Sequence, residues 1–505
     1  MLSRILYLPL ILPLTGVFAA AMFVPALHAL YLDDHSVAQA FFYSGILGFA
    51  FVAMTGLSLA NRSKKDNSDL ENLASLFLAY TVLPLFLALP FYEGLETTSY
   101  LNAYVEMVSS FTTTGAPLFE ADRLTESLHL WRGIVGWLGG LVIWISASAV
   151  LAPLNLGGFE VTARAEPGQG EERFDRFKRA SSAKRITRIS QDLIPIYAGL
   201  TFLVWLFMVV ANEDPLTAAI LAMSTLATSG ITPLDGLDGM QTGFYGEAVI
   251  FLFLAFGLSR LTFSKDSITS VNSQLRYDPE FRMGLVLVLA VPLLLFSRHW
   301  IGAIEFEEQE NLRSAMSALW GGMFTILSFL TTTGFESAAW AQSQDWSGLS
   351  TPGLILLGLA LVGGGVATTA GGVKLLRVYA LYLNGRRELE KLVLPSSMGN
   401  ASGSSRRIRR QGAFIAWVFF MLFALSLALI TVIFALLGQD FEAALVLTIA
   451  ALSTTGPLID SATTNTIELL DIGAPAKLVL CVAMVLGRLE TLGLIALFNL
   501  RVWRA

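Results

Sequence analysis

Residues 109–117 read Ser-Ser-Phe-Thr-Thr-Thr-Gly-Ala-Pro, and similar segments return three more times along the 505-residue chain. The others read Ser-Thr-Leu-Ala-Thr-Ser-Gly-Ile-Thr at 224–232, Leu-Ser-Phe-Leu-Thr-Thr-Thr-Gly-Phe at 327–335 and Ala-Leu-Ser-Thr-Thr-Gly-Pro at 451–457. Their glycines lie 115, 104 and 122 residues apart. Because self-similarity at a steady period is typical of repeated structural units, we expect the chain to contain one unit four times.

The stretches that lead into these segments are apolar but too short to span a membrane. Residues 214–226 and 440–451 amount to only 13 and 12 residues, whereas a helix needs roughly 20 to cross about 30 Å of hydrocarbon. Each stretch must therefore enter the membrane and turn back, with a full span before it and another after it. Non-helical backbone at that depth is tolerated only inside protein or beside water, so four such loops around one axis would enclose a water-filled path.

The residue types in the loops suit the binding of a cation. Threonine and serine supply hydroxyl groups, glycine permits backbone angles that point carbonyl groups inward, and a ring of carbonyls can replace a cation's hydration shell. Each short helix also aims its negative C-terminal end at the loop. One Thr-Thr-Gly alone is more simply a helix C-cap, but four copies favour a selectivity filter. Its predicted ligands are Thr113, Thr114 and Gly115 (loop 1), Thr228, Ser229 and Gly230 (loop 2), Thr332, Thr333 and Gly334 (loop 3), and Thr454, Thr455 and Gly456 (loop 4).

The composition predicts an all-α membrane protein. Apolar residues make up 54% of the chain and charged residues 14%, with a mean hydropathy of +0.63, whereas a soluble domain carries roughly 25% charged residues. We expect about ten transmembrane helices, with the four units of span, pore helix, filter loop and span around one pseudo-fourfold pore. The apolar runs cover 5–31, 38–60, 74–95, 130–153, 190–212, 243–263, 282–305, 349–383, 411–438 and 474–500. The first is longer than the core of a signal peptide and is expected to be retained.

The distribution of charge predicts the orientation. Two segments, 164–188 and 374–410, hold eight and nine basic residues, while the loops 33–37, 213–242 and 439–473 hold none. The positive-inside rule places both basic segments and both termini in the cytoplasm. The opposite loops are acidic, which raises the local cation concentration or simply keeps the loops soluble.

Other chemistries find little support in the composition. The single cysteine, Cys481, excludes a disulfide framework, and four scattered histidines do not suggest a metal centre. The net charge of −6 argues against nucleic-acid binding. No catalytic motif stands out, and a membrane-embedded enzyme would need clustered acids or histidines within its spans. Arg488 and Glu490 are interpreted as nearly the only charges deep in a span.

Five glycines interrupt the apolar run 349–383, and residues 363–372 are called the glycine-rich loop below. Glycine costs up to about 1 kcal/mol each in a helix interior, so a straight helix is poorly specified there. An irregular gate under the filter is favoured over a packing groove against a neighbouring helix. The glycines are Gly363, Gly364, Gly365, Gly371 and Gly372.

Arg488 is expected about 20 Å along the last helix, too deep to reach the outer surface easily. It would place a positive charge just inside the filter and bond carbonyls of the glycine-rich loop. The alternative is a structural ion pair, although Glu490, two residues away, would not face it on a helix.

The four loops resemble the selectivity filters of the Trk/Ktr/HKT superfamily of potassium transporters. Four further segments of this chain resemble motifs of the same family. They are Trp131-Arg-Gly-Ile-Val-Gly-Trp-Leu-Gly-Gly140, Arg164-Ala-Glu-Pro-Gly168, Gly363-Gly-Gly-Val-Ala-Thr-Thr-Ala-Gly-Gly-Val-Lys374 and Gly487-Arg-Leu-Glu490. The two extra N-terminal spans match the TrkH branch better than the shorter KtrB branch. The chain departs from the family at Ala367, usually glycine, and at Thr368, usually serine.

The resemblance implies a subunit of the bacterial inner membrane that conducts potassium inward, with K⁺ as the transported ion and no organic cofactor on this chain. It also implies a homodimer with one pore per chain, contact with membrane lipid, and a cytosolic nucleotide-binding ring of the TrkA kind that gates it. Lys374 and Arg488 join the glycines of the loop as gate residues. The alternative of a sodium-permeable or ion-coupled symporter is opposed by the filter glycines, because serine in place of the first goes with sodium permeation in this superfamily.

These expectations divide the chain into segments. They are 1–66 (two extra helices), 67–165 (pore repeat 1), 166–189 (basic linker), 190–275 (repeat 2), 276–390 (repeat 3 with the gate), 391–410 (basic linker) and 411–505 (repeat 4).

Overall fold

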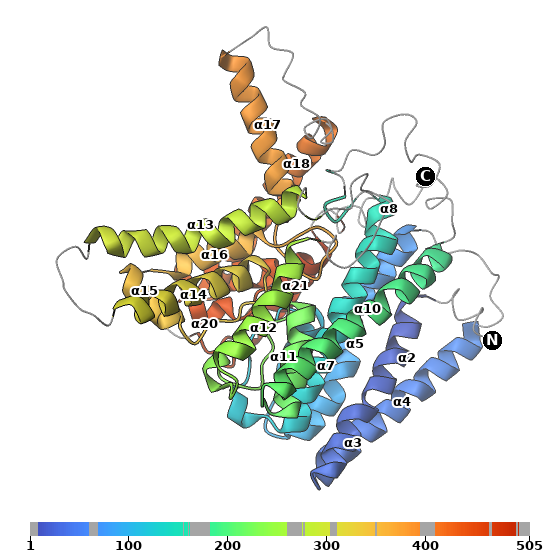
Figure 1. The fold of residues 1–505 in the computed structure, drawn as a ribbon. Coiled ribbons are helices and arrows are strands. Elements are labelled where there is room, and N and C mark those ends of the chain that lie inside the picture. Colours follow the sequence, from blue (N-terminus) through green and yellow to red (C-terminus); the bar gives the residue numbers. More distant parts are fainter. Residues whose placement is uncertain are drawn as a thin grey trace.

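A computed structural model describes most of the chain and shows only helices, turns and loops in the described residues (Figure 1). The described residues are 9–59, 69–154, 156–159, 161, 182–259, 275, 278–302, 311–348, 351–393, 410–463, 467–490 and 493. Residues 164–181 and 394–409 of the two basic segments lie outside them, as do the Arg164–Gly168 motif and the end of the last apolar run.

The chain begins with a helical hairpin at one side of the molecule (Figure 1). Helices α2 (Ile11–Ala21) and α3 (Phe23–Tyr31) run on from each other and pack against α4 (His35–Leu59). The ring of Phe18 meets that of Phe111 edge-on at a centroid distance of 5.2 Å. This hairpin therefore supports the first of the short helices from outside.

The remaining helices follow in four groups, each containing one helix that leads into one of the four loops. These helices have 12, 13 and 13 residues in groups 1, 2 and 4 but 20 residues in group 3, so the expectation of a short helix before each loop holds for three of the four. Group 1 holds α5 (Asp69–Leu95), α6 (Tyr100–Phe111), α7 (Glu126–Ser146) with a π turn (Ala147–Leu151), and α8 (Ala152–Leu154). Group 2 holds α10 (Ser182–Val210), α11 (Pro215–Ala227) and α12 (Phe244–Leu254) with a 3₁₀ turn (Ala255–Leu258). Group 3 holds α13 (Pro279–Gly302), α14 (Asn311–Leu330), α15 (Trp340–Ser347), α16 (Gly353–Val362) and α17 (Leu375–Val393). Group 4 holds α18 (Arg410–Leu436), α19 (Phe441–Ser453), α20 (Leu458–Ala462) and α21 (Ala474–Leu489).

Seven helical stretches of the described chain are long and apolar enough to cross a membrane. They correspond to seven of the ten apolar runs. The other three runs form shorter or divided helices: 243–263 contains α12 with its turn, 349–383 is divided between α16 and α17, and 474–500 is described as a continuous helix only over α21. The described chain is therefore helical, with seven stretches that qualify as membrane spans by length and composition.

Burial separates central helices from peripheral ones. In Glu126–Leu154, 83% of the most apolar window is buried inside the protein, against 22% in Ser182–Val210. Side chains such as Phe202, Phe207 and Val210 remain exposed on α10. An exposed apolar face of this length suits hydrocarbon rather than water, whereas α7 packs in the middle among α6 and α11.

Candidate cation pathway

The four loops share one unusual backbone conformation. Their first residues, Thr113, Thr228, Thr332 and Thr454, have φ angles of 55°, 49°, 58° and 56°. A β-branched residue rarely adopts this left-handed region because its Cβ approaches the backbone too closely. The same strained angle at four equivalent positions marks one local structure built four times.

One hydrogen bond also repeats in each loop. The backbone N–H of the second residue (Thr114, Ser229, Thr333, Thr455) donates to the carbonyl oxygen five residues earlier, at 2.9, 3.0, 2.9 and 2.8 Å. That carbonyl belongs to the last turn of the short helix, where intrahelical partners run out. The helix end and the loop therefore fix each other.

The glycines allow the loops to meet side by side. A Cβ added to Gly115 would lie 1.8 Å from the carbonyl oxygen of Ser229, and one on Gly230 would lie 2.2 Å from that of Thr333. One on Gly456 would lie 2.1 Å from the backbone nitrogen of Ala116.

The remaining contact joins loop 3 to loop 4, because a Cβ on Gly334 would touch the Pro457 ring at 3.0 Å. Loop 1 therefore contacts loop 2, loop 2 contacts loop 3, loop 3 contacts loop 4, and loop 4 returns to loop 1. The structure brings all twelve predicted ligands into this closed ring. Gly456 alone of the four glycines lacks a positive φ, and its N–H donates to the carbonyl of Thr114 at 2.6 Å.

The hydroxyl groups of the ring are buried and differ in their partners. The threonine and serine side chains of the four loops are at most 2% exposed. Among the described residues, the hydroxyl groups of Thr113 and Thr454 have no hydrogen-bond partner. Leaving a buried hydroxyl unpaired costs about 1–3 kcal/mol, so the ring holds oxygen atoms that an entering cation or water would satisfy.

The equivalent hydroxyl groups in loops 2 and 3 bond to the glycine-rich loop. Thr228 Oγ1 lies 3.1 Å from Thr369 Oγ1, and Thr332 Oγ1 accepts from the N–H of Gly371 at 2.7 Å. A Cβ on Gly371 would lie 2.1 Å from the carbonyl oxygen of Ser453 in group 4. The glycine-rich loop is thus pressed against three of the four loops on one side of the ring.

Helix α16 ends at Val362 and α17 begins at Leu375, so the break in the run 349–383 extends to Lys374. Residues Ala367 and Lys374 adopt φ angles of 55° and 84°. Ala367 therefore carries a Cβ in a left-handed conformation that costs roughly 1–2 kcal/mol. Thr368 donates its hydroxyl to the carbonyl of Gly365 at 2.8 Å.

Charged side chains hold this loop from several directions. Arg488 Nη1 donates to the carbonyl of Thr369 at 2.7 Å, and Lys374 Nζ donates to that of Ala370. Glu280, at the start of α13, accepts from the N–H of Val366 at 2.9 Å. The expected contact between Arg488 and a loop carbonyl is therefore present.

Glu490 pairs with a different arginine. Its Oε2 lies 2.6 Å from Nη2 of Arg377, whose guanidinium also lies 3.6 Å from the centroid of the Phe419 ring. The partner of Glu490 is thus supplied by α17 rather than by Arg488, as the geometry of a helix predicts.

A small cavity lies beside the glycine-rich loop. It is lined by that loop, by Arg488 and by three residues of group 1, Ile143, Ala147 and Leu151.

The view that Arg488 and Glu490 are nearly the only charges deep in a span is wrong. Sequence reasoning missed Glu106, Arg132 and Glu247, which are at most 4% exposed. Arg132 Nε lies 2.5 Å from Glu106 Oε1, joining α7 to α6. Arg132 inside the apolar run 130–153 and Glu247 inside the run 243–263 were the available signal, because a charge at that depth needs a partner.

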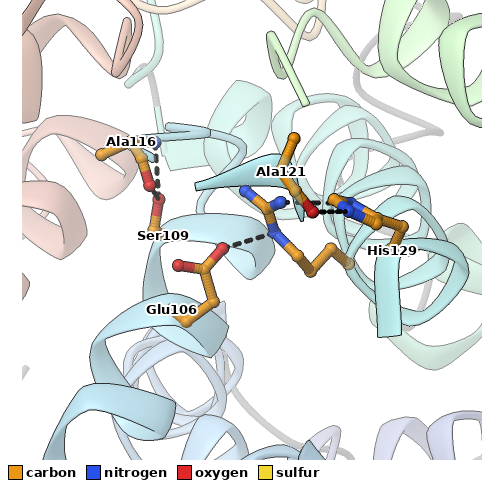
Figure 2. Close-up of polar contacts among 6 residues, drawn as sticks. Glu106, Ser109, Ala116, Ala121 and His129 are labelled. Carbon is orange, nitrogen blue, oxygen red and sulfur yellow. Dashed lines mark hydrogen bonds and ion pairs between the residues drawn. The ribbon is translucent and has the colours of Figure 1, made fainter. Parts of the chain in front are cut away.

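The Glu106–Arg132 pair lies beside the segment that leaves loop 1. Ser109 accepts from the N–H of Ala116 at 2.8 Å, and His129 Nε2 lies 2.9 Å from the carbonyl of Ala121. Figure 2 shows Glu106 and Ser109 on α6 and His129 on α7, with Ala116 and Ala121 beside them. Polar groups from two helices therefore fix the chain immediately after the ring.

Two acidic residues follow loops 3 and 4. Burial raises the pKa of Glu336 from its ordinary value, a contact with Ser461 lowers it, and the charge of Asp238 raises it. Burial and then the charge of Glu336 raise the pKa of Asp460 to about 6. The charge of Glu336 therefore acts on the carboxyl group of Asp460 next to the ring.

Comparison with known proteins places the chain among cation transporters. Residues 38–502 match the family model TrkH, described as a cation transport protein. The chain is 30% identical to the Trk system potassium uptake protein TrkH of Halomonas elongata, over 100% of this chain and 99% of that one. It is 28% identical to the protein of that name from Escherichia coli, over 96% of each. The crystal structure of the potassium transporter TrkH from Vibrio parahaemolyticus matches with a TM-score of 0.76 at 26% identity, over 100% of both chains.

Proposed function

Because the chain belongs to the TrkH family of cation transport proteins, we propose that it carries potassium ions inward across the bacterial inner membrane through its ring of four loops. The observation that carries this proposal is the closed ring itself, in which four loops of one backbone conformation contact each other in turn. The potassium uptake proteins of Halomonas elongata and Escherichia coli, similar along nearly their whole length, support potassium as the ion.

The ring acts as the selectivity filter. Its carbonyl oxygens, aided by the unpaired hydroxyls of Thr113 and Thr454, replace the water around a dehydrated cation. Four pore helices, α6, α11, α14 and α19, end at the ring with their negative ends toward it. In this proposal about ten spans surround one pseudo-fourfold pore, divided into the repeats 67–165, 190–275, 276–390 and 411–505, with 1–66 as extra helices and 166–189 and 391–410 as cytoplasmic linkers.

The glycine-rich loop acts as the gate. Its contacts with Thr228 and Thr332 support a position directly against the filter, and Arg488 and Lys374 hold its carbonyls there. A cytosolic TrkA-like nucleotide-binding ring opens it, in a homodimer whose termini both lie in the cytoplasm. Shortening the glycine-rich loop by two glycines should raise the basal potassium flux and make the flux less dependent on the cytosolic TrkA-like partner. If a folded deletion variant still depended on the cytosolic partner to the same degree, the glycines would serve helix packing instead of gating.

Flux measurements on purified protein in liposomes test the function. Under a set membrane potential, potassium and rubidium should enter and sodium should largely not. A pH gradient imposed at constant potential separates a channel from a proton-coupled symporter, and a sodium gradient tests sodium coupling. Sodium flux equal to potassium flux would overturn the assignment and favour a sodium-permeable relative.

A further inference from the structure

A carboxylate from group 2 holds the chain that leaves loop 3. We call residues 335–339, which follow Gly334 directly, the third strap. Glu247 Oε1 accepts from the N–H of Ala338 at 2.7 Å, and Oε2 accepts from the hydroxyl of Ser337 at 2.8 Å. Oε2 also accepts from Nε1 of Trp320 at 2.7 Å. One side chain, 3% exposed, thus makes three short hydrogen bonds.

These bonds join three elements that are distant along the chain. Glu247 lies on α12, Trp320 lies on the pore helix α14, and Ser337 and Ala338 belong to the third strap. The strap has little room to shift on its other side, because a Cβ on Gly321 of α14 would lie 2.4 Å from the carbonyl oxygen of Ala339. The backbone after loop 3 is therefore fixed between two helices, by the carboxylate of Glu247 and by Thr325 Oγ1 of α14, which accepts from the N–H of Ser337 at 3.2 Å.

The chain that follows loop 2 is held differently. Glu213 accepts from Thr242 N and Oγ1 at 3.1 and 2.9 Å, and it belongs to the same group as the segment that it holds. Glu247 instead reaches from group 2 into group 3, so its bonds fix one loop relative to its neighbour in the ring. Gly230 and Thr333 are the residues that meet across that boundary.

Resting on the filter assignment above, we propose that Glu247 is a positioning residue for ion selectivity, because it holds loop 3 at a fixed distance from loop 2. A carbonyl ring that can contract coordinates the smaller sodium ion as well as potassium. Losing these bonds removes restraints three and four residues beyond Gly334, so loop 3 can move toward the axis. Glu247 itself contacts no ion in this proposal.

Three substitutions separate positioning from simple charge. Glu247→Gln keeps the size and one acceptor but presents an amide N–H₂ to Trp320 and Ser337. Trp320→Phe and Ser337→Ala keep the negative charge and remove one donor each. We expect the potassium-to-sodium permeability ratio in liposomes to fall on the order of tenfold in Glu247→Gln and a few-fold in each of the others. In the Glu247→Gln background, Trp320→Phe should add little, because the bond is already lost.

The control is Glu126→Gln, an exposed carboxylate at the start of α7, which should leave the ratio unchanged. If Trp320→Phe and Ser337→Ala keep the wild-type ratio, the positioning role is wrong, whatever Glu247→Gln does. Trp320→Phe and Ser337→Ala still test the positioning role if Glu247→Gln does not fold. If Gly334→Ser alters the ratio and the three variants do not, only the role of Glu247 fails. If Gly115→Ser and Gly334→Ser both have no effect either, the filter assignment fails.

Discussion

The ring of four loops and the glycine-rich loop are both non-helical backbone buried within a helical protein, yet they are built from opposite chemistry. None of the twelve residues of the ring is charged. The glycine-rich loop is held by Arg488, Lys374 and Glu280, and Arg377 and Glu490 lie paired beside it. The ring is built from one loop repeated four times, whereas this charged surround occurs once among the described residues.

The difference teaches which function each region can serve. A neutral ring of backbone carbonyls presents the same ligands at any pH, as a selectivity filter requires. Charged side chains bonded to the glycine-rich loop hold it in place, and these contacts can break and be replaced by others when the loop changes conformation. Substitutions in the ring should therefore change which ion passes, and substitutions around the loop should change stability or rate while selectivity is kept.

The largest effect is expected from breaking the buried ion pair beside the gate. Glu490→Gln removes the carboxylate charge that lies 2.6 Å from Arg377, which is 0% exposed, and removing one partner of a buried pair costs about 3–5 kcal/mol. Thermal unfolding in detergent measures the loss. The control Glu390→Gln breaks an exposed pair with Arg386 and should cost less than about 1 kcal/mol. Equal melting temperatures for the two variants would contradict the claim that the buried pair stabilises the fold more than the exposed pair does.

Selectivity should fall next, through the ring. The side chain in Gly115→Ser must displace the Ser229 carbonyl oxygen, which lies 1.8 Å from where the new Cβ would stand, and must adopt a φ of +66°. We expect the potassium-to-sodium ratio to drop by at least about tenfold, since carbonyl positions set the preference. Gly358→Ser is the control, because a Cβ there meets nothing within 4 Å. Unchanged ratios in both Gly115→Ser and Gly334→Ser would remove the filter assignment.

Arg488→Ala should act on rate and leave selectivity intact. The variant removes a positive charge and the bond to Thr369, so the glycine-rich loop is released while the carbonyl ring stays complete. We expect the maximal potassium flux to rise a few-fold, because arginine keeps its charge at any relevant pH and repels a cation below the filter. Arg386→Ala, on the exposed part of α17, is the control. A well-expressed Arg488→Ala protein with lower or equal flux would favour a purely structural role.

The smallest effect is expected from the acids beside the ring. With its pKa raised to about 6, Asp460 is ionised at pH 7.5 and loses its negative charge as the pH falls through 6. Glu336, whose pKa is also raised, loses charge in the same direction. A negative mouth concentrates cations, so uptake from dilute potassium should fall about twofold between pH 7.5 and 5. Asp460→Asn should weaken this dependence and Asp122→Asn should not; an unchanged pH profile in Asp460→Asn would exclude the role.

Much of the fold and the ring could be predicted because their signals are local and repeated. A run of apolar residues sets helix and membrane depth, and a pre-loop stretch such as 440–451 is too short to cross. Repetition of Thr/Ser-Thr/Ser-Gly then indicated equivalent loops, and the structure gives Thr113, Thr228, Thr332 and Thr454 one shared conformation. The glycines of 363–372 predicted the break between α16 and α17 for the same local reason.

Only the tertiary structure decided which buried groups meet. Trp320 and Glu247 are 73 residues apart along the chain, and Arg377 and Glu490 are 113 apart. A lone charge in an apolar run predicts that some partner exists, because an unpaired charge there is too costly. It does not say which partner, since that depends on how helices from different groups pack. Backbone conformation follows from neighbours in sequence, whereas pairing follows from neighbours in space.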